Sequence, residues 1–152
     1  MSLSRRQAFY FGKEMNVKQS LIAFMDRDPL SDYSRLAGIG NCWVGVHNNR
    51  RRQMVMIQSF NHTTLSNLYH LSRATHQNVV RLFAVYCYQE VFHAVLEYVD
   101  LDIIDLIPLS EQEISGVLSQ AIAAVHGLSS QSITFRINGM RLSYTGLVKI
   151  GM

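Results

Sequence analysis

The stretch that decides the fold is residues 76–99, His-Gln-Asn-Val-Val-Arg-Leu-Phe-Ala-Val-Tyr-Cys-Tyr-Gln-Glu-Val-Phe-His-Ala-Val-Leu-Glu-Tyr-Val. It contains two runs rich in valine, phenylalanine and tyrosine, residues 79–88 and 91–99, and only the polar pair Gln89 and Glu90 separates them. This pattern predicts a β-hairpin whose two strands are both largely buried. Because two strands alone bury too little surface to be stable in water, further strands and at least one helix must cover the hairpin.

The chain before the hairpin supplies this cover. Residues 36–46 read as two strands around a glycine-containing bend, residues 47–53 as a polar turn, and residues 54–57 as a third strand. Residues 61–73 have apolar side chains at helical spacing, with Asn61 or Thr63 as the N-cap. Earlier, Val17, Leu21, Phe24 and Met25 form one helical stripe that ends before Asp28-Pro29. We therefore expect a five-stranded antiparallel sheet with one packed helix, preceded by a helical extension.

The chain after the hairpin predicts a second, smaller assembly. Residues 100–108 are a short apolar and acidic segment that predicts one or two helical turns. Ser110 and Glu113 form a capping box that opens a long helix, and Gly127 is its expected C-cap. Residues 140–150 then predict a small hairpin. The fold class expected for the whole chain is α+β.

The composition indicates a globular chain of one domain or two small lobes. It has 152 residues, of which 48% are hydrophobic and 16% charged, and a net charge of only +3. The basic cluster at Arg50–Arg52 reads as a solvated turn rather than a nucleic-acid contact. Cys42 and Cys87 have no metal or disulfide spacing, and no signal peptide or membrane span is evident. We expect a cytoplasmic protein without nucleic-acid or membrane partners.

Three features could carry chemistry, and for each the structural interpretation is the stronger one. The six histidines are scattered and form no metal motif. Asp100, Asp102 and Asp105 could suggest an acidic metal site, but they are more typical of a solvated face. Cys42 beside Trp43 could be a reactive thiol, but a half-buried loop cysteine is the commoner case. We expect no metal and no cofactor.

The order of elements, together with several motifs, resembles the first half of a protein kinase domain. Ile39-Gly40 stands where the glycine-rich loop begins, and residues 55–58, Val-Met-Ile-Gln, stand where kinases have Val-Ala-Ile-Lys. His76-Gln-Asn-Val-Val80 resembles the His-Pro-Asn-Ile-Val segment, and residues 95–99 resemble the fifth strand and hinge. Residues 109–114 resemble the start of the long C-lobe helix, and residues 145–150 resemble the hairpin before the Asp-Phe-Gly motif. The lead-in at 17–35 is similar to PAK-type kinases of the STE group.

This resemblance implies three parts. They are an N-terminal helical extension (1–27), a kinase-like N-lobe (28–99) and a truncated C-lobe remnant of one long helix and a small hairpin (100–152). It also implies that the phosphotransfer residues are missing. The positions that differ from the kinase pattern are Cys42 for the middle loop glycine, Gln58 for the lysine, Asn67 for the helix glutamate, Arg136 for the catalytic aspartate, Gly139 for the metal-binding asparagine and Met152 for the Asp-Phe-Gly aspartate. Without these groups neither phosphate charge nor magnesium can be held, so we expect no catalysis and no ATP binding.

The long helix would then lack the C-lobe helices that cover it in kinases. Its apolar stripe consists of Ile114, Val117, Leu118, Ala121, Ile122 and Val125. The candidate interface taken from this stripe is Ile114, Val117, Leu118, Ala121 and Val125. The stripe could pack on the terminal hairpin and the underside of the sheet, or it could be buried against a second chain. We expect a pseudokinase that acts as a protein-interaction or regulatory module, through a homodimer or through docking on a related kinase or signalling protein. The alternative is a residual nucleotide-binding regulator with at most very weak kinase activity.

Overall fold

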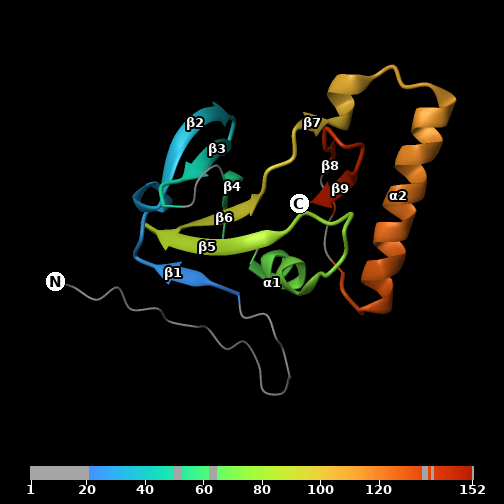
Figure 1. The fold of residues 1–152 in the computed structure, drawn as a ribbon. Coiled ribbons are helices and arrows are strands. Elements are labelled where there is room, and N and C mark those ends of the chain that lie inside the picture. The colour runs from blue at the N-terminus through green and yellow to red at the C-terminus, as the bar shows by residue number, and fades with distance from the viewer. Residues whose placement is uncertain (1–20, 50–52, 62–64, 135–136, 138, 152) are drawn as a thin grey trace. The chain divides into compact units, whose positions relative to one another are not determined.

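The computed structural model describes residues 21–49, 53–61, 65–134, 137 and 139–151 (Figure 1). Its fold is α+β, with a six-stranded mixed sheet, a three-stranded sheet and two α-helices among the described residues. The chain divides into two compact units. Residues up to 72 form the first unit together with 82–98, and residues 73–81 form the second together with 99–152. The chain therefore passes between the units three times.

The first unit is built on the six-stranded sheet. In chain order its strands are β1 (Ala23–Met25), β2 (Tyr33–Ile39), β3 (Cys42–His47), β4 (Met54–Phe60), β5 (Leu82–Tyr88) and β6 (Val91–Glu97). In space the order is β1-β5-β6-β4-β3-β2. β1 is parallel to β5, and every other neighbouring pair is antiparallel.

The predicted central hairpin is confirmed as β5 and β6. Gln89 and Glu90 both have positive φ, 48° and 63°, as a tight two-residue turn between antiparallel strands requires. The first strand begins at Leu82 rather than at residue 79. Val79 and Val80 are instead buried in the second unit. They are apolar because they belong to the core of that unit, not because they extend the strand.

The helix predicted over residues 17–25 is wrong in its described part. Ala23–Met25 is the strand β1, which pairs in parallel with residues 85–87 of β5, and residues 17–20 lie outside the described residues. The sheet is therefore six-stranded and mixed, not five-stranded and antiparallel. Without β1 the backbone edge of β5 would lack a partner strand, and this pairing overrides the helical spacing of the apolar residues.

The sheet curls around its own core. Tyr33 on β2 and Tyr86 on β5 are four strands apart in the sheet, which in a flat sheet would be about 19 Å. Their ring centroids are only 6.2 Å apart. The enclosed hydrophobic cluster consists of Tyr33, Trp43, Val55, Ile57, Ala84, Tyr86 and Val95. The other face carries Val85, Ala94 and Leu96, which are also buried.

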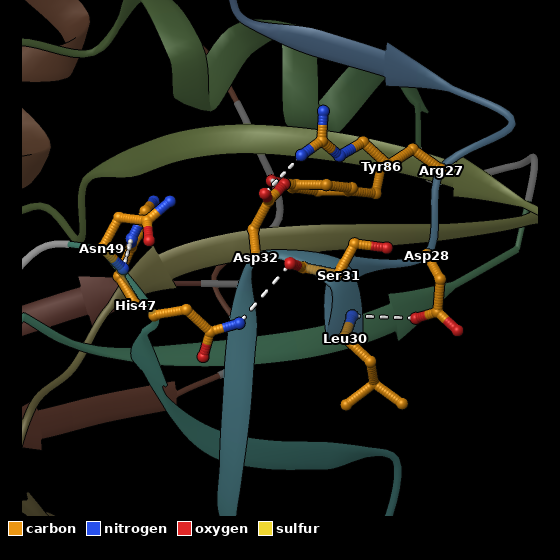
Figure 2. A network of polar contacts seen from close by, with 9 residues as sticks. Arg27, Asp28, Leu30, Ser31, Asp32, His47, Asn49 and Tyr86 are labelled. Atoms are coloured by element: carbon orange, nitrogen blue, oxygen red, sulfur yellow. Dashed lines mark hydrogen bonds and ion pairs between the residues drawn. The ribbon is translucent and has the colours of Figure 1, made fainter. Parts of the chain in front are cut away.

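A polar network closes the curl where β1 leads into β2 (Figure 2). The hydroxyl of Tyr86 donates to Asp32 Oδ2 at 2.7 Å, and Arg27 forms an ion pair with the same carboxylate. The guanidinium of Arg27 also lies 5.3 Å from the ring centroid of Phe24, which stacks on Tyr86. Burial and the acceptor Asp32 raise the pKa of Tyr86 far above its usual range. Pro29 opens the short 3-10 turn Pro29–Ser31, with Asp28 as its N-cap.

The predicted helix over residues 61–73 is confirmed as α1 (Leu65–Arg73), which buries Leu68 and Leu71. One proposed cap, Thr63, lies outside the described residues, as does the Arg50–Arg52 cluster. The second unit contains β7 (Leu101–Asp102), the 3-10 turn Ile103–Leu106, α2 (Glu111–Ser130), β8 (Gly139–Leu142) and β9 (Val148–Gly151). The predicted helical turn is confirmed as the 3-10 turn, and the predicted terminal hairpin is confirmed as β8 and β9. The strand β7, which extends this hairpin to a three-stranded sheet, was not predicted.

The capping box of α2 is confirmed, but its predicted end is wrong. Ser110 accepts from the backbone N–H of Glu113, and the Glu113 carboxylate accepts from the backbone N–H of Ser110. Gly127 is not the C-cap, because the helix continues to Ser130 and Gln131 caps it. A Cβ built on Gly127 would lie only 2.5 Å from Cδ2 of His76. The glycine therefore permits close packing of the imidazole against the helix.

A buried amide network joins three segments of the second unit. Asn78 is 2% exposed, and its amide nitrogen donates to Gln120 Oε1 at 2.9 Å and to the carbonyl oxygen of Val148 at 2.8 Å. The same Gln120 oxygen accepts from the backbone N–H of Val148, and its Nε2 donates to the carbonyl of Gly146. The backbone of Asn78 also accepts from the N–H of Ile150. Gln120 thus fixes the orientation of α2 against β9.

Candidate functional site

The loop that resembles a glycine-rich loop is a tight turn. Ile39 and Cys42 are register partners of β2 and β3, so only Gly40 and Asn41 form the connection. Gly40 has a φ of 59°, as such a turn requires. Asn41 is tied to β4, since its carbonyl accepts from the backbone N–H of Ser59 and its side chain donates to the carbonyl of Ser59. A two-residue turn held in this way has no backbone to spare for wrapping around phosphates.

Two of the predicted degenerate positions lie side by side in this region. Cys42 and Gln58 are cross-strand partners on β3 and β4, and both are half-buried. The ring of Trp43 points into the enclosed core and is only 9% exposed. Neither side chain of this strand pair carries the positive charge that a lysine would offer to a phosphate group.

The remaining degenerate positions are divided between the two units or lie outside the described residues. Asn67 lies half-buried on α1, in the first unit. Gly139 is the exposed first residue of β8, in the second unit, where it pairs with Gly151. Arg136 and Met152 lie outside the described residues.

Apart from the exposed Ala123, the apolar residues of α2 form two neighbouring faces. One face is directed into the second unit: Ala124 and Leu128 are buried, Val117 and Ala121 are half-buried, and the helix contacts β9. At 3.6 residues per turn these four positions fall within a narrow arc of the helix. Val117 and Ala121 of the predicted interface therefore belong to the packed side of the helix.

The other face of α2 is open within the second unit. It consists of Ile114, Leu118, Ile122 and Val125, which we call the α2 apolar face, and its members are 44%, 51%, 67% and 48% exposed. Ile122 is the most exposed of the four, and it is missing from the predicted interface. The apolar arc of α2 spans roughly 160° at 3.6 residues per turn, more than one packing face needs. This width is the sequence signal that separates the two faces.

A shallow hollow runs along the α2 apolar face. It is lined by Glu111, Ile114, Ser115, Leu118, Ser119 and Ile122. The small serines lie between larger aliphatic side chains, so the surface has a groove flanked by ridges. The hydroxyl of Ser119 donates to the carbonyl of Gly116 at 3.0 Å. This donor would therefore keep its hydrogen bond if a partner covered the serine. Such a surface is suited to receiving another helix.

The charges of α2 are confined to its ends. Glu111 and Glu113 lie in the first turn, where the helix dipole favours acids, and the hydrogen bonds from Ser110 lower the pKa of Glu113. His126 is the one titratable side chain near the other end, and the helix contains no lysine or arginine. The α2 apolar face can therefore bind through shape and hydrophobic contact, with weak electrostatic guidance at its ends.

The other candidate groups have structural roles. Asp102 caps the 3-10 turn by accepting from the backbone N–H of Ile104, and Asp100 accepts from the N–H of Tyr144. Burial raises the pKa of the Cys87 thiol, so it is less readily ionised than an ordinary cysteine. In the described part of the chain, no three His, Cys, Asp or Glu side chains are grouped so that they could hold a metal ion.

No protein-family model matches this sequence, and a search of curated proteins likewise found no match. Across the described ranges, neither α-helix has the length and apolar character needed to cross a membrane.

Proposed function

We propose that this chain is a catalytically inactive, kinase-like protein of the cytoplasm that acts by binding another protein through the α2 apolar face. The observation that carries the proposal is the exposure of Ile114, Leu118, Ile122 and Val125 on one face of a well-capped helix. Contiguous exposed apolar side chains on a soluble domain mark interaction sites more often than they serve any other purpose. A pseudokinase is the proposal that also accounts for the order of elements and for the replaced motif residues.

The absence of catalysis in this proposal is supported by the neutral strand pair and the tight loop. Phosphoryl transfer needs a cation on the phosphates and a carboxylate to hold magnesium. Gln58 stands at the lysine position, beside Cys42, and the Gly40-Asn41 turn is tied to β4. A lobe of this kind can keep its packing while it loses the groups that bind nucleotide.

The first experiment tests whether the α2 apolar face is open in solution. The dye 8-anilinonaphthalene-1-sulfonate fluoresces on exposed apolar surface and would be titrated with the full chain at low protein concentration. We expect wild type to enhance the fluorescence and Ile122→Glu to reduce the enhancement several-fold. The matched control is Ile104→Glu, the same substitution at a residue that is 73% exposed but lies before α2. Equal dye binding by wild type and Ile122→Glu would refute the proposed binding face.

The second experiment tests the loss of nucleotide binding. Thermal unfolding of the full chain would be measured with increasing ATP, with and without magnesium. We expect no change in the melting temperature, because a ligand raises it only when it binds the folded state. A rise that grows with ATP concentration and needs magnesium would contradict the proposal and favour a nucleotide-binding regulator.

A further inference from the structure

We propose that the partner of the α2 apolar face is a second copy of this chain, packed antiparallel along α2. The inference rests on the proposed function, because it names the partner of the same face. Self-association in a symmetric dimer requires one surface to be complementary to itself about a two-fold axis. The residues of α2 meet this requirement in both shape and charge.

The shape is self-complementary about a point between Leu118 and Ser119. With the two-fold axis there, Ile122 of the second copy faces Ser115, and Leu118 of the second copy faces Ser119. Each large side chain of one helix then meets a small one of the other, on the hollow that these residues line. Such packing of ridges into grooves brings two helices to within about 8–10 Å.

The polar side chains at the ends of α2 and its dipole agree with the antiparallel direction. The same axis places Glu111 of each copy opposite His126 of the other, at both ends of the helix pair. Antiparallel helices also place the dipole ends of opposite sign next to each other. In a parallel pair the two acidic first turns, each with Glu111 and Glu113, would lie side by side and repel.

A membrane surface fits the same face poorly. Helices that lie on anionic lipid combine an apolar face with lysine and arginine on the polar flank. α2 has neither residue, and its first turn is acidic.

The size of the face also bears on the strength of the dimer. One helix face per copy buries less than a standard interface of about 1,600 Å² in total, so association should be weak and depend on concentration.

The first test is the solution mass of the full chain by sedimentation and light scattering over a wide concentration range. We expect the mass to rise from that of the 17.3 kDa monomer toward twice this value. Ile122→Glu should remain monomeric throughout, whereas the control Ile104→Glu should dimerise like wild type. A wild-type mass that stays monomeric at all concentrations, or an unaffected Ile122→Glu dimer, would overturn the inference.

The second test determines the direction of the helices by charge exchange. His126→Glu should weaken the dimer at least several-fold, because each end of the pair would then hold two acids. Adding Glu111→Lys in the same chain should restore the affinity, since opposite charges would again face each other. If His126→Glu weakens the dimer and the double variant fails to recover, the antiparallel pairing is wrong.

Cysteine cross-linking gives an independent test of direction, measured against wild type with its native Cys42 and Cys87. Leu118→Cys lies near the axis and should form a covalent dimer upon mild oxidation. Ser129→Cys should not, because at 1.5 Å per residue its two copies would be about 30 Å apart. Equal cross-linking at both positions would indicate a parallel pair and overturn the inference.

The dye experiment separates a failure of this inference from a failure of the proposed function. If wild type binds the dye through Ile122 but never dimerises, the face is open and its partner is not a second copy. That result overturns the inference and leaves the proposed function standing. If Ile122→Glu changes neither dye binding nor mass, both are refuted.

Discussion

The two glycines of α2 should respond in opposite ways to the same substitution. Gly116 and Gly127 both lie inside the helix, and replacing a helical glycine by alanine ordinarily stabilises a protein by about 0.5–1 kcal/mol. A Cβ on Gly116 would have no heavy atom within 4 Å. We therefore expect Gly116→Ala to raise the free energy of unfolding by this amount.

At Gly127 the new methyl group would meet the imidazole of His76, at 2.5 Å from Cδ2 and 3.1 Å from Nε2. The ring cannot easily turn away, because its Nδ1 accepts from the backbone N–H of Asn78 at 3.1 Å. Forcing an extra methyl into such a contact costs about 1–3 kcal/mol. The intrinsic helix preference cancels between the two variants, so Gly127→Ala should be less stable than Gly116→Ala by about the same 1–3 kcal/mol.

The assay is urea unfolding of the full chain followed by circular dichroism at 222 nm, with the midpoints compared at equal slopes. A third variant isolates the contact. Asparagine at position 76 is smaller and can still accept from the N–H of residue 78 through its side-chain oxygen. In a His76→Asn background, Gly127→Ala should therefore no longer destabilise. If Gly127→Ala stabilises wild type as much as Gly116→Ala does, the close packing of His76 on α2 is refuted.

Three further predictions concern single polar groups. Gln120→Ala should lower the free energy of unfolding by about 1–3 kcal/mol, because the buried Asn78 amide and the Val148 N–H lose their shared acceptor. The control is Gln112→Ala, at an exposed position of the same helix, and an equal effect of both variants in urea unfolding would contradict the network. The pKa of Glu113 is lowered in the folded state, so its contribution to stability is present above pH 4.5 and is lost as the pH falls through the folded pKa. The difference in free energy of unfolding between wild type and Ser110→Ala should therefore shrink in that acidic range, and a difference independent of pH would disprove the role of the Ser110 hydrogen bonds. The pKa of Tyr86 is raised on folding, so wild type should lose stability as the pH rises above 10.0, and Tyr86→Phe should lose less. If the free energy of unfolding falls with pH equally in both proteins, the Tyr86 hydroxyl is not held in its buried, protonated form.

Local signals in the sequence predicted the local structure well. The β5–β6 hairpin follows from two apolar runs around a polar pair, and the start of α2 follows from the Ser110–Glu113 capping box. In both cases the contacts that determine the structure join residues close together in the sequence, so the local pattern is enough to predict them.

The errors arose where a distant segment decides the structure. Residues 17–25 have apolar side chains at helical spacing, but Ala23–Met25 pairs with the backbone edge of β5 as a strand. Gly127 looked like a helix end, whereas His76, 51 residues earlier, requires a glycine inside the helix. The candidate interface mixed two faces of α2, because periodicity alone does not show which part of a wide apolar arc β9 covers. Tertiary partners cannot be read from the spacing of side chains along one element.

The interleaving of the two units sets the order in which the chain can fold during synthesis. Residues 73–81 belong to the second unit, yet they leave the ribosome before the strands β5 and β6 of the first. Their partners come much later, since Asn78 binds the carbonyl of Val148, 70 residues further along the chain, and Val80 donates to the carbonyl of Ile150. The first unit can therefore complete its sheet early, with a loop held open inside it. The second unit must wait for the last strand, and contacts of such long sequence separation are slow to form.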